Sequence, residues 1–398
     1  MKPTPDSKNY DVIVVGMGPA GAAAAYELSQ AGLSVLGLEK STHPRYKVCG
    51  GGLSARIERI LPSDFQSVVE ETIYRVQFTY GGKDSFVIES SQPIAYMTMR
   101  DHFDQWLMHK ARLAGTEVRE DEPAENIKAL PEGVEVTTAQ GRYHGQYVIG
   151  ADGAMSLVAQ HFFPDRRLRK IPALESEIRN GSSHLYGQTH MTLISLSAAK
   201  KGYGWIFPKR NGLSVGVGEF VSGAKRPKQS FHTFSTQDPT LATLQIPTPL
   251  GHPLPIFNQN PKTNGDQWTG SLVKHRAMLV GDAGHLVDPL LGEGIYYAIR
   301  SGQLAANSIL SVLGNPNQRL DQYEKAAYQE FGQEFRIASR LAGIIYGLPR
   351  VFHHWMGRTF PDGYQRVLHR YCQVLQGFET YQTLWARVRQ RLPAPFRR

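Results

Sequence analysis

Hydrophobic residues near the start of the chain follow the pattern of a strand, a helix and a second strand. Four apolar residues in a row, 12–15, predict a buried parallel strand; an Ala-rich helix follows, and the apolar run 33–38 predicts the next strand. Three glycines lie between the first strand and the helix in G-x-G-x-x-G spacing: Gly16, Gly18 and Gly21. The second strand ends at Glu39, whose carboxylate can accept hydrogen bonds from a ribose. This arrangement predicts a dinucleotide site, because such glycines let the backbone approach a pyrophosphate at a helix N-terminus.

The pattern of apolar positions changes in the middle of the chain. The β-rich segments 74–79 and 85–89 flank a Gly-Gly turn and predict a hairpin. Long β-type runs from about residue 185 to 221 include an Asn-Gly turn, which predicts a sheet rather than a repeat of strand and helix. Residues 222–265 are rich in Pro, Lys, Gln and Asn, so we expect an inserted or covering loop with a short helix at 231–244.

The first domain resumes later in the chain. An apolar strand at 277–281 is followed by a helix that extends to about residue 313. Earlier pieces of the same domain are a helix that opens at residue 99 and short strands at 116–119, 134–138 and 147–149. Residues 318–398 are predicted to be helical, with an apolar stripe formed by Phe331, Phe335, Ala338, Leu341 and Ile345.

The composition is that of an ordinary globular protein, with 41% hydrophobic and 20% charged residues. The first ten residues are polar and the first strand begins directly after them, so we expect no secretion signal and a cytoplasmic location. The two cysteines, Cys49 and Cys372, are too few for a disulfide framework, and no C-x-x-C or His cluster indicates a metal. The apolar runs are too short or too interrupted to predict a membrane-spanning helix.

The net charge of +9 favours acidic partners, such as phosphorylated substrates or an anionic membrane contacted peripherally. Nucleic acid is the weaker interpretation, because no recognition motif accompanies the charge. Part of the excess lies near the end of the chain, at Arg387, Arg389, Arg391, Arg397 and Arg398. For these arginines a solvated tail is the simplest interpretation.

Several separated motifs identify a family resemblance. The first glycine turn, GADG at 150–153 and GDAG at 281–284 resemble, in this order, the FAD-dependent fold of p-hydroxybenzoate hydroxylase and its relatives. Within that fold the chain is similar to the geranylgeranyl reductase family from about residue 10 to 304. The similarity rests on four further motifs: PRYKVCGGGLS at 44–54, RxxFD at 100–104, YGWIFPK at 203–209 and GEGIYYA at 292–298.

The pattern and the resemblance together predict an α/β (α+β) fold in three parts. The first is a discontinuous, Rossmann-like FAD-binding domain made of residues 1–73, 96–155 and 270–317. The second is an inserted substrate domain with an antiparallel β-sheet, made of residues 74–95 and 156–269. Residues 318–398 form a C-terminal helical segment.

The resemblance also implies which residues hold FAD. Near the pyrophosphate it places Gly16, Gly18, Ala20 and Gly21, near the adenosine Glu39, Lys40 and Ala124, and along the rest of the cofactor Gly50, Arg100, Asp282, Gly292, Gly294 and Ile295. The last three belong to a turn whose free N–H groups at a helix start can stabilise negative charge on a reduced flavin. For Arg100 an ordinary ion pair with Asp104 is the alternative.

Four further residues are candidates for the chemistry. By the resemblance, the Cys49 thiol lies near the flavin, where it could position an alkene or relay a proton; the alternative is a small buried hydrophobe. Tyr203, Trp205 and Phe207 resemble the residues that line the substrate channel of the reductases. Aromatic strands are also common in protein cores, so both interpretations stay open.

These features favour a reductase that saturates isolated C=C bonds of a prenyl chain in a lipid, a diphosphate or a quinone. A flavin-dependent monooxygenase or halogenase is the main alternative, because His285 resembles the hydroxylase version of its motif. A non-catalytic lipid- or flavin-binding protein is the third. No second G-x-G-x-x-G motif is present, so we expect either transient docking of NADPH or a small electron carrier as the reductant. The sequence does not define the oligomeric state.

Overall fold

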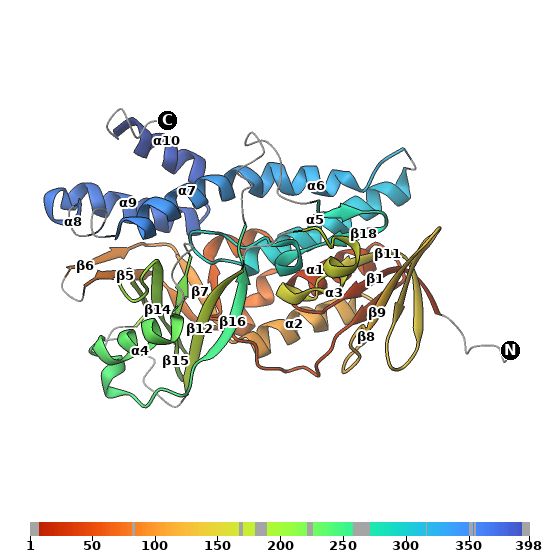
Figure 1. Cartoon of the computed structure of the whole chain (residues 1–398), viewed down its shortest axis with the longest axis horizontal. Coiled ribbons are helices and arrows are strands. Elements are labelled where there is room, and N and C mark those ends of the chain that lie inside the picture. Colours follow the sequence, from red (N-terminus) through yellow and green to blue (C-terminus); the bar gives the residue numbers. More distant parts are fainter. Residues whose placement is uncertain are drawn as a thin grey trace.

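The computed structural model describes residues 8–81, 84–166, 170–179, 189–220, 226–257, 271–315, 317–349, 353 and 356–391. Figure 1 shows a larger sheet near the N-terminus, a second sheet beside it, and the C-terminal helices, in blue, running along one side of the molecule past both sheets. Mixed α/β architecture with a Rossmann-like sheet, a second sheet and helices at the end is therefore confirmed.

The larger sheet is organised around β1 (Lys8–Val15). This strand pairs in parallel with β2 (Val35–Leu38) on one side and with β11 (Arg142–Gly150) on the other. The strand order is β17-β18-β11-β1-β2-β8, and a hairpin of β9 and β10 attaches to β11. The outer strands are β8 (Glu117–Arg119), β9 (Asn126–Leu130), β10 (Gly133–Thr137), β17 (Val273–Lys274) and β18 (Ala277–Leu279). Because β1 is buried between neighbours, its apolar run matches the predicted parallel strand.

Helices pack closely around this sheet because small residues line their contacts. The helices are α1 (Pro19–Gln30), α2 (Arg100–Leu113), α3 (Leu157–Phe162) and α5 (Ile295–Gly314). At the contact of α1 with α5, a Cβ added at Gly302 would lie 2.2 Å from the carbonyl oxygen of Ala20. Only glycine therefore permits this approach, which brings the start of α5 close to the glycine turn.

The second sheet has the order β16-β12-β15-β14-β13-β5-β6. Its strands are β5 (Arg75–Tyr80), β6 (Asp84–Glu89), β12 (Lys170–Arg179), β13 (Met191–Ser195), β14 (Gly202–Lys209), β15 (Gly212–Glu219) and β16 (Leu250–Pro255). The predicted hairpin is present as β5 and β6, and the Asn-Gly turn joins β14 to β15. The pairs are antiparallel except β13 with β5, which is parallel.

The expectation of an inserted or covering loop over residues 222–265 is wrong at residues 250–255. Residues 250–255 form the edge strand β16, which pairs with β12, and α4 (Pro227–Gln237) supplies the short helix slightly earlier than predicted. Pro253 and Pro255 obscured this strand in the sequence, and an edge position tolerates proline. The parts of the predicted β-run and loop at 185–188, 221–225 and 258–265 lie outside the described residues.

A small third sheet consists of three short strands. In it β7 (Ala95–Thr98) pairs with β3 (Gly52–Ser54) and with β4 (Val69–Ile73). The 3-10 helices Ala55–Arg59 and Ser63–Val68 connect β3 to β4. This sheet matters for the site because it fixes the end of the triple-glycine loop against β7.

The C-terminal helices are α6 (Asp321–Ala327), α7 (Gln333–Gly347), α8 (Met356–Thr359), α9 (Pro361–Leu375) and α10 (Tyr381–Arg391). Four members of the predicted apolar stripe are buried and Ile345 is half-buried. Residues of α7, α9 and α10 share one hydrophobic cluster with Tyr203, Trp205 and Leu291. Within the part of the chain that the structure describes, no helix is both long and apolar enough to cross a membrane. Arg397 and Arg398 lie outside the described residues, as do residues 1–7 and the predicted domain boundary at 269–270.

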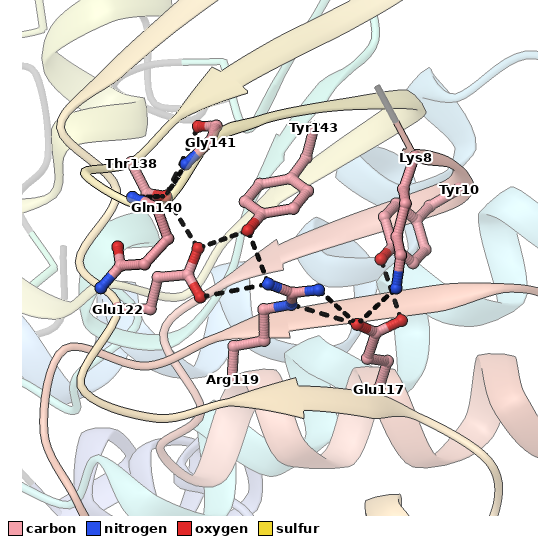
Figure 2. Close-up of polar contacts among 9 residues, drawn as sticks. All are labelled: Lys8, Tyr10, Glu117, Arg119, Glu122, Thr138, Gln140, Gly141 and Tyr143. Carbon is pink, nitrogen blue, oxygen red and sulfur yellow. Dashed lines mark hydrogen bonds and ion pairs between the residues drawn. The ribbon is translucent and has the colours of Figure 1, made fainter. Parts of the chain in front are cut away.

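A polar cluster fixes the edge of the larger sheet next to the end of β2 (Figure 2). It comprises Lys8, Tyr10, Glu117, Arg119, Glu122, Thr138, Gln140, Gly141 and Tyr143. The Tyr143 hydroxyl accepts from Arg119 at 2.8 Å and donates to Glu122 at 2.6 Å. Since the backbone N–H of Glu39 donates to the carbonyl of Arg119 at 2.9 Å, this cluster supports the segment beside Glu39.

Candidate functional site

The glycine turn between β1 and α1 is shaped by steric constraints at two glycines and left open at the third. Gly16 has φ +93°, and a Cβ there would lie 2.5 Å from the carbonyl oxygen of Ala151. A Cβ at Gly21 would lie 1.9 Å from the carbonyl oxygen of Gly16. At Gly18, by contrast, the atom nearest to an added Cβ is Nη2 of Arg45, at 3.8 Å.

The N-terminus of α1 has no side-chain cap, and Pro19 lies in its first turn. Its free backbone N–H groups can therefore bind an anion, and the open approach at Gly18 leaves room for one. Arg45 adds a buried Nη1 donor that has no hydrogen-bond partner among the described residues. These three features fit the pyrophosphate of FAD, and the predicted Ala20 lies buried in the same turn.

Glu39 lies beside this turn at the end of β2. Its buried carboxylate accepts hydrogen bonds from the N–H of Met17 at 2.9 Å and of Ser41 at 3.2 Å. Its carbonyl accepts from Glu122 at 2.9 Å, which brings the segment with half-buried Ala124 alongside, whereas Lys40 is exposed. The structure thus brings together the residues predicted for the adenosine end, and their contact with the cofactor stays a prediction.

Arg100, the first residue of α2, forms a bidentate ion pair with Asp104 at 2.8 and 2.9 Å. Asp104 is fully buried and also pairs with Arg45 at 2.8 Å. Burial alone would raise the pKa of Asp104, but the two guanidinium groups hold it below its ordinary value. The predicted alternative for Arg100, an ion pair, is therefore present, and it orients the arginine beside the Cys49 loop. The sequence analysis missed Arg45 as a site residue, although this arginine belongs to the PRYKVCGGGLS motif.

The Cys49 loop is held by a buried lysine. Lys209 Nζ donates to the carbonyl of Gly50 at 2.7 Å and to that of Thr98 at 2.8 Å, and burial lowers its pKa to about 8. Gly51 has φ +63°, and a Cβ there would lie 2.1 Å from the carbonyl oxygen of Thr98. The triple glycine thus lets the loop lie directly on β7.

The Cys49 side chain is half-buried and accepts a hydrogen bond from the N–H of Gly51 at 3.4 Å. The charges of Lys47, Arg100 and Lys209 all interact with it. Burial lowers the pKa of Lys47 to about 8, and its Nζ lies 2.7 Å from Nε2 of His252 on β16. Cys49 therefore lies in a positively charged environment rather than in a purely apolar one.

The aromatic residues of β14 lie against this loop. A Cβ at Gly50 would lie 2.9 Å from Nε1 of Trp205 and 3.1 Å from the ring of Phe207. The Trp205 N–H is buried and has no hydrogen-bond partner among the described residues. Tyr203 continues the row and stacks on Phe220 at 5.1 Å between ring centroids. The structure thus brings Cys49, Gly50 and the three predicted aromatic residues together.

The turn before α5 is held by residues from distant parts of the chain. Asp288 accepts from the N–H groups of Leu290 at 2.7 Å and Leu291 at 2.9 Å, and from the Tyr381 hydroxyl at 2.8 Å. The Tyr203 hydroxyl donates to the carbonyl of Leu291, and Tyr346 donates to that of Leu290 at 2.9 Å. Sequence reasoning missed Asp288, because the contacts that define its role come from other elements.

This turn leads to Gly292, with φ +67°, and to Gly294 immediately before α5. Helix α5 begins at buried Ile295 and has no side-chain cap, so its first N–H groups can face a ligand. Between the glycines, buried Glu293 pairs with Ser54 and Arg56. Glu293 was also missed; as an acid inside the GEGIYYA motif, it was visible in the sequence.

Asp282 lies in the preceding 3-10 helix, Gly281–Gly284, and His285 directly follows this helix. A Cβ at Gly294 would lie 3.8 Å from Oδ1 of Asp282, so this carboxyl faces the start of α5. Burial raises the pKa of Asp282, while the charges of Lys47 and Arg100 oppose the shift. Burial and Arg166 lower the pKa of His285 to about 3, so its imidazole is neutral at physiological pH.

Comparison with known proteins also groups this chain with FAD-binding proteins. The family model described as FAD binding domain matches residues 9–333. The geranylgeranyl diphosphate reductase of Rhodobacter capsulatus is 28% identical over 351 residues, 85% of this chain and 84% of that protein. The crystal structure of a geranylgeranyl bacteriochlorophyll reductase-like protein of Thermoplasma acidophilum is 25% identical, with TM-score 0.74 over 85% of this chain and 87% of that chain. A flavin-dependent brominase, 20% identical with TM-score 0.71 over 96% and 99% of the two chains, shares the fold.

Proposed function

Because the chain belongs to the FAD binding domain family and resembles geranylgeranyl reductases, we propose that this FAD-dependent oxidoreductase saturates isolated C=C bonds of a prenyl chain. The prenyl chain would belong to a lipid, a diphosphate or a quinone. One observation carries the proposal: the Cys49 loop packs on Trp205 and Phe207, so two motifs of the resemblance, 159 residues apart at Lys209 and Gly50, meet in one place.

The chemistry divides between cofactor and protein. When bound and reduced, FAD supplies the hydride that is added to one alkene carbon, and a proton must reach the other carbon. An unactivated alkene offers no hydrogen-bonding handle, so the protein must orient it by shape. In this proposal Tyr203, Trp205 and Phe207 orient the alkene and exclude water from it.

Cys49 is proposed to hold the proton for the second carbon at its Sγ. Lys47, Arg100 and Lys209 surround this side chain with positive charge. Lys209 has a second role, because its two hydrogen bonds fix the loop that carries the thiol. The free N–H groups at the start of α5 would stabilise negative charge on the cofactor.

The test is product formation under anaerobic conditions. The FAD-loaded protein is reduced with dithionite and incubated with geranylgeranyl diphosphate, a prenylated quinone or a geranylgeranylated glycerol lipid, and the products are analysed by mass spectrometry. We expect one of these to gain two hydrogens for each bond reduced while the flavin is reoxidised. If the flavin stays reduced and none of the three gains hydrogen, the reductase proposal is wrong.

Variants of the two cysteines separate chemistry from packing. Cys49→Ala should lower turnover at least tenfold with normal FAD content, because the proton donor is lost. Cys372→Ala is the packing control: this thiol is buried in α9, in the hydrophobic cluster that includes Tyr203 and Trp205, so its loss tests packing and should lower turnover less than Cys49→Ala does. Equal turnover of both variants would leave Cys49 as a packing residue.

A monooxygenase or halogenase is the second candidate, and His285 favours it through its resemblance to the hydroxylase motif. The brominase likeness supports the shared fold alone. Oxygen consumption that rises with an apolar or aromatic substrate, with no saturated product, would identify this class. FAD that binds without being reoxidised by any substrate would favour a non-catalytic binding protein.

The reductant and the membrane contact stay predictions. NADPH or a small electron carrier is expected to reduce FAD, and the net charge of +9 is expected to favour peripheral contact with anionic lipid. Sedimentation with vesicles that contain phosphatidylglycerol, compared with vesicles of phosphatidylcholine alone, tests the second expectation. Equal sedimentation with both would contradict it.

A further inference from the structure

A buried glutamate lies on the face of the second sheet that the Cys49 loop covers, and the proposed reaction does not use it. Glu175, on β12, is 2% exposed. It pairs with Gly216 of β15, and Gly216 in turn pairs with Trp205 of β14. Residues directly opposite one another in antiparallel strands point to the same face of a sheet. The carboxyl of Glu175 therefore belongs to the wall that carries the aromatic residues of β14.

Gly216 brings the tryptophan ring towards this acid. A Cβ at Gly216 would lie 2.1 Å from Cζ2 of Trp205, so the indole extends from β14 over the glycine of β15, in the direction of β12. In the neighbouring set of paired residues, Glu177 lies opposite Ser214, and Ser214 lies opposite Phe207. Two acids of β12 thus share one face with the two aromatic rings that contact the Cys49 loop.

The Cys49 loop contacts the buried acid through a tyrosine. The Tyr46 hydroxyl donates to Oε2 of Glu175 at 2.7 Å, and the Ser214 hydroxyl donates to Oε1 at 3.0 Å. Tyr46 is 43% exposed, whereas Glu175 is buried. The phenol therefore connects the carboxyl to solvent, three residues before the cysteine in the same loop.

Glu175 can hold a proton near neutral pH. Burial raises the pKa of its carboxyl to about 7, and the negative charge of Glu177 acts in the same direction. The hydrogen bonds from Tyr46 and Ser214 and the charge of Lys209 oppose the shift. A carboxyl of this kind can both release and take up a proton under the conditions in which an enzyme works.

Lys209 connects the buried acid with the cysteine. Its positive charge acts on Glu175 and on Cys49, and its Nζ is fixed by the hydrogen bond to the carbonyl of Gly50 at 2.7 Å. If a proton passes from the carboxyl to a thiolate at Cys49, the negative charge moves from the sulfur to the carboxylate. Both charges interact with the same ammonium group, so the transfer separates no new charge inside the protein.

We propose that Glu175 reloads Cys49 with a proton after each alkene has been saturated. This inference rests on the proposed function, in which the thiol gives its proton to the second alkene carbon. The broken S–H bond forms again with the proton of the Glu175 carboxyl, and water returns a proton to the carboxylate through the Tyr46 hydroxyl. Glu175 is thus a relay residue that repeated turnover needs and the first turnover does not.

The experiment compares one turnover with many. FAD-loaded full chain is reduced with one equivalent of dithionite and mixed anaerobically with geranylgeranyl diphosphate, a prenylated quinone or a geranylgeranylated glycerol lipid, and flavin reoxidation is followed by stopped flow. Excess dithionite then supports repeated turnover. In Glu175→Gln we expect a first turnover within about twofold of the wild type and repeated turnover at least about tenfold slower, because the thiol starts with its proton but regains it slowly.

Two further variants control for packing. Ser214→Ala removes the other side-chain hydrogen bond to Glu175 but keeps the acid, so both rates should stay within about twofold of the wild type. Tyr46→Phe keeps the ring and removes the hydroxyl that connects the acid to solvent. We expect it to slow repeated turnover alone, and by less than Glu175→Gln does.

An infrared measurement needs neither substrate nor reduced flavin. The spectrum of the wild type minus that of Glu175→Gln should contain a protonated carboxyl band that disappears as pH rises through the pKa of about 7. The relay is overturned if this band is absent in weakly acidic buffer. It is also overturned if both rates of Glu175→Gln fall by the same factor, or if neither falls, with wild-type melting temperature and FAD content. In each of these cases the wild type still forms saturated product, whereas a wild type that forms none refutes the proposed function itself.

Discussion

The glycine turn and the Cys49 loop both use glycines to bring backbone segments close together, but they are held in different ways. The turn is built mainly from contacts of backbone atoms: Gly21 packs on Gly16, Gly16 packs on the carbonyl of Ala151, and the N–H of Met17 donates to Glu39, 22 residues away. The Cys49 loop depends on Lys209, 159 residues away from Gly50. The turn before α5 is similar, since Tyr381 reaches Asp288 across 93 residues. The predicted phosphate side is therefore defined by backbone shape, and the predicted flavin side by long-range side-chain contacts.

Substitutions in the glycine turn should have the largest effect. In Gly21→Ala the new Cβ would meet the Gly16 carbonyl oxygen at 1.9 Å, and this backbone atom cannot move without opening the turn. We expect loss of FAD from the purified protein and a melting temperature lowered by about 2–10 °C, since overpacking of this kind costs about 1–3 kcal/mol. Flavin absorbance of the protein fraction and thermal melting measure both.

Gly18→Ala is the matched control within the same turn. No atom lies nearer than 3.8 Å to its added Cβ, and its φ of −70° suits alanine. This variant should fold with a near-normal melting temperature but bind FAD more weakly, because the methyl group occupies the approach to the phosphate. If Gly21→Ala retains FAD as well as the wild type, the account of this turn as a steric constraint is wrong.

Lys209→Met should impair the reaction at the predicted flavin side and leave FAD binding at the predicted phosphate side intact. The change leaves the carbonyls of Gly50 and Thr98 without their buried donor, at about 1–3 kcal/mol, although it also removes the cost of burying a charge. We expect at least a tenfold loss of alkene reduction with FAD content close to that of the wild type. Arg210→Met, at the exposed neighbouring position, controls for any general effect on the turn. Parallel loss of FAD and of activity in Lys209→Met would show that the two sides are not independent.

Asp288 gives a smaller, pH-dependent effect. Burial raises the pKa of its carboxyl from 3.8 to about 6, so between these values the native state holds a proton that the unfolded chain has released. The stability contributed by this proton is present below pH 3.8 and lost as pH rises through 6. Asp288→Asn should remove this dependence of stability on pH, which amounts to about 2–3 kcal/mol for the rise in pKa from 3.8 to about 6. Urea unfolding of both proteins across this pH range measures it, and identical slopes would contradict the assignment.

The difference between backbone geometry and long-range side-chain contacts also explains which parts of the molecule could be predicted from the sequence. The strand, the glycines and Glu39 carry their own local geometry, so the larger sheet and the phosphate turn followed from spacing. The hairpin of β5 and β6 followed from its turn. Prolines hid the edge strand β16, because their meaning depends on which strand lies beside them. Asp288 was not predictable for the same reason: its partner Tyr381 comes from a helix whose docking no local pattern specifies.

The smallest effect is expected at the polar cluster beside Glu39, which is also local to the larger sheet (Figure 2). Tyr143→Phe removes the hydroxyl that accepts from Arg119 and donates to Glu122, but Thr138 continues to donate to Glu122 at 2.7 Å. We expect a loss of about 1 kcal/mol in the free energy of unfolding, with FAD affinity within about twofold of the wild type. Tyr10→Phe, which removes a single hydrogen bond to Glu117 at the same sheet edge, is the comparison and should cost no more. Urea unfolding and FAD titration of the stripped protein measure the two quantities. A large loss of FAD affinity in Tyr143→Phe would mean that the adenosine side, too, depends on side-chain networks rather than on backbone shape.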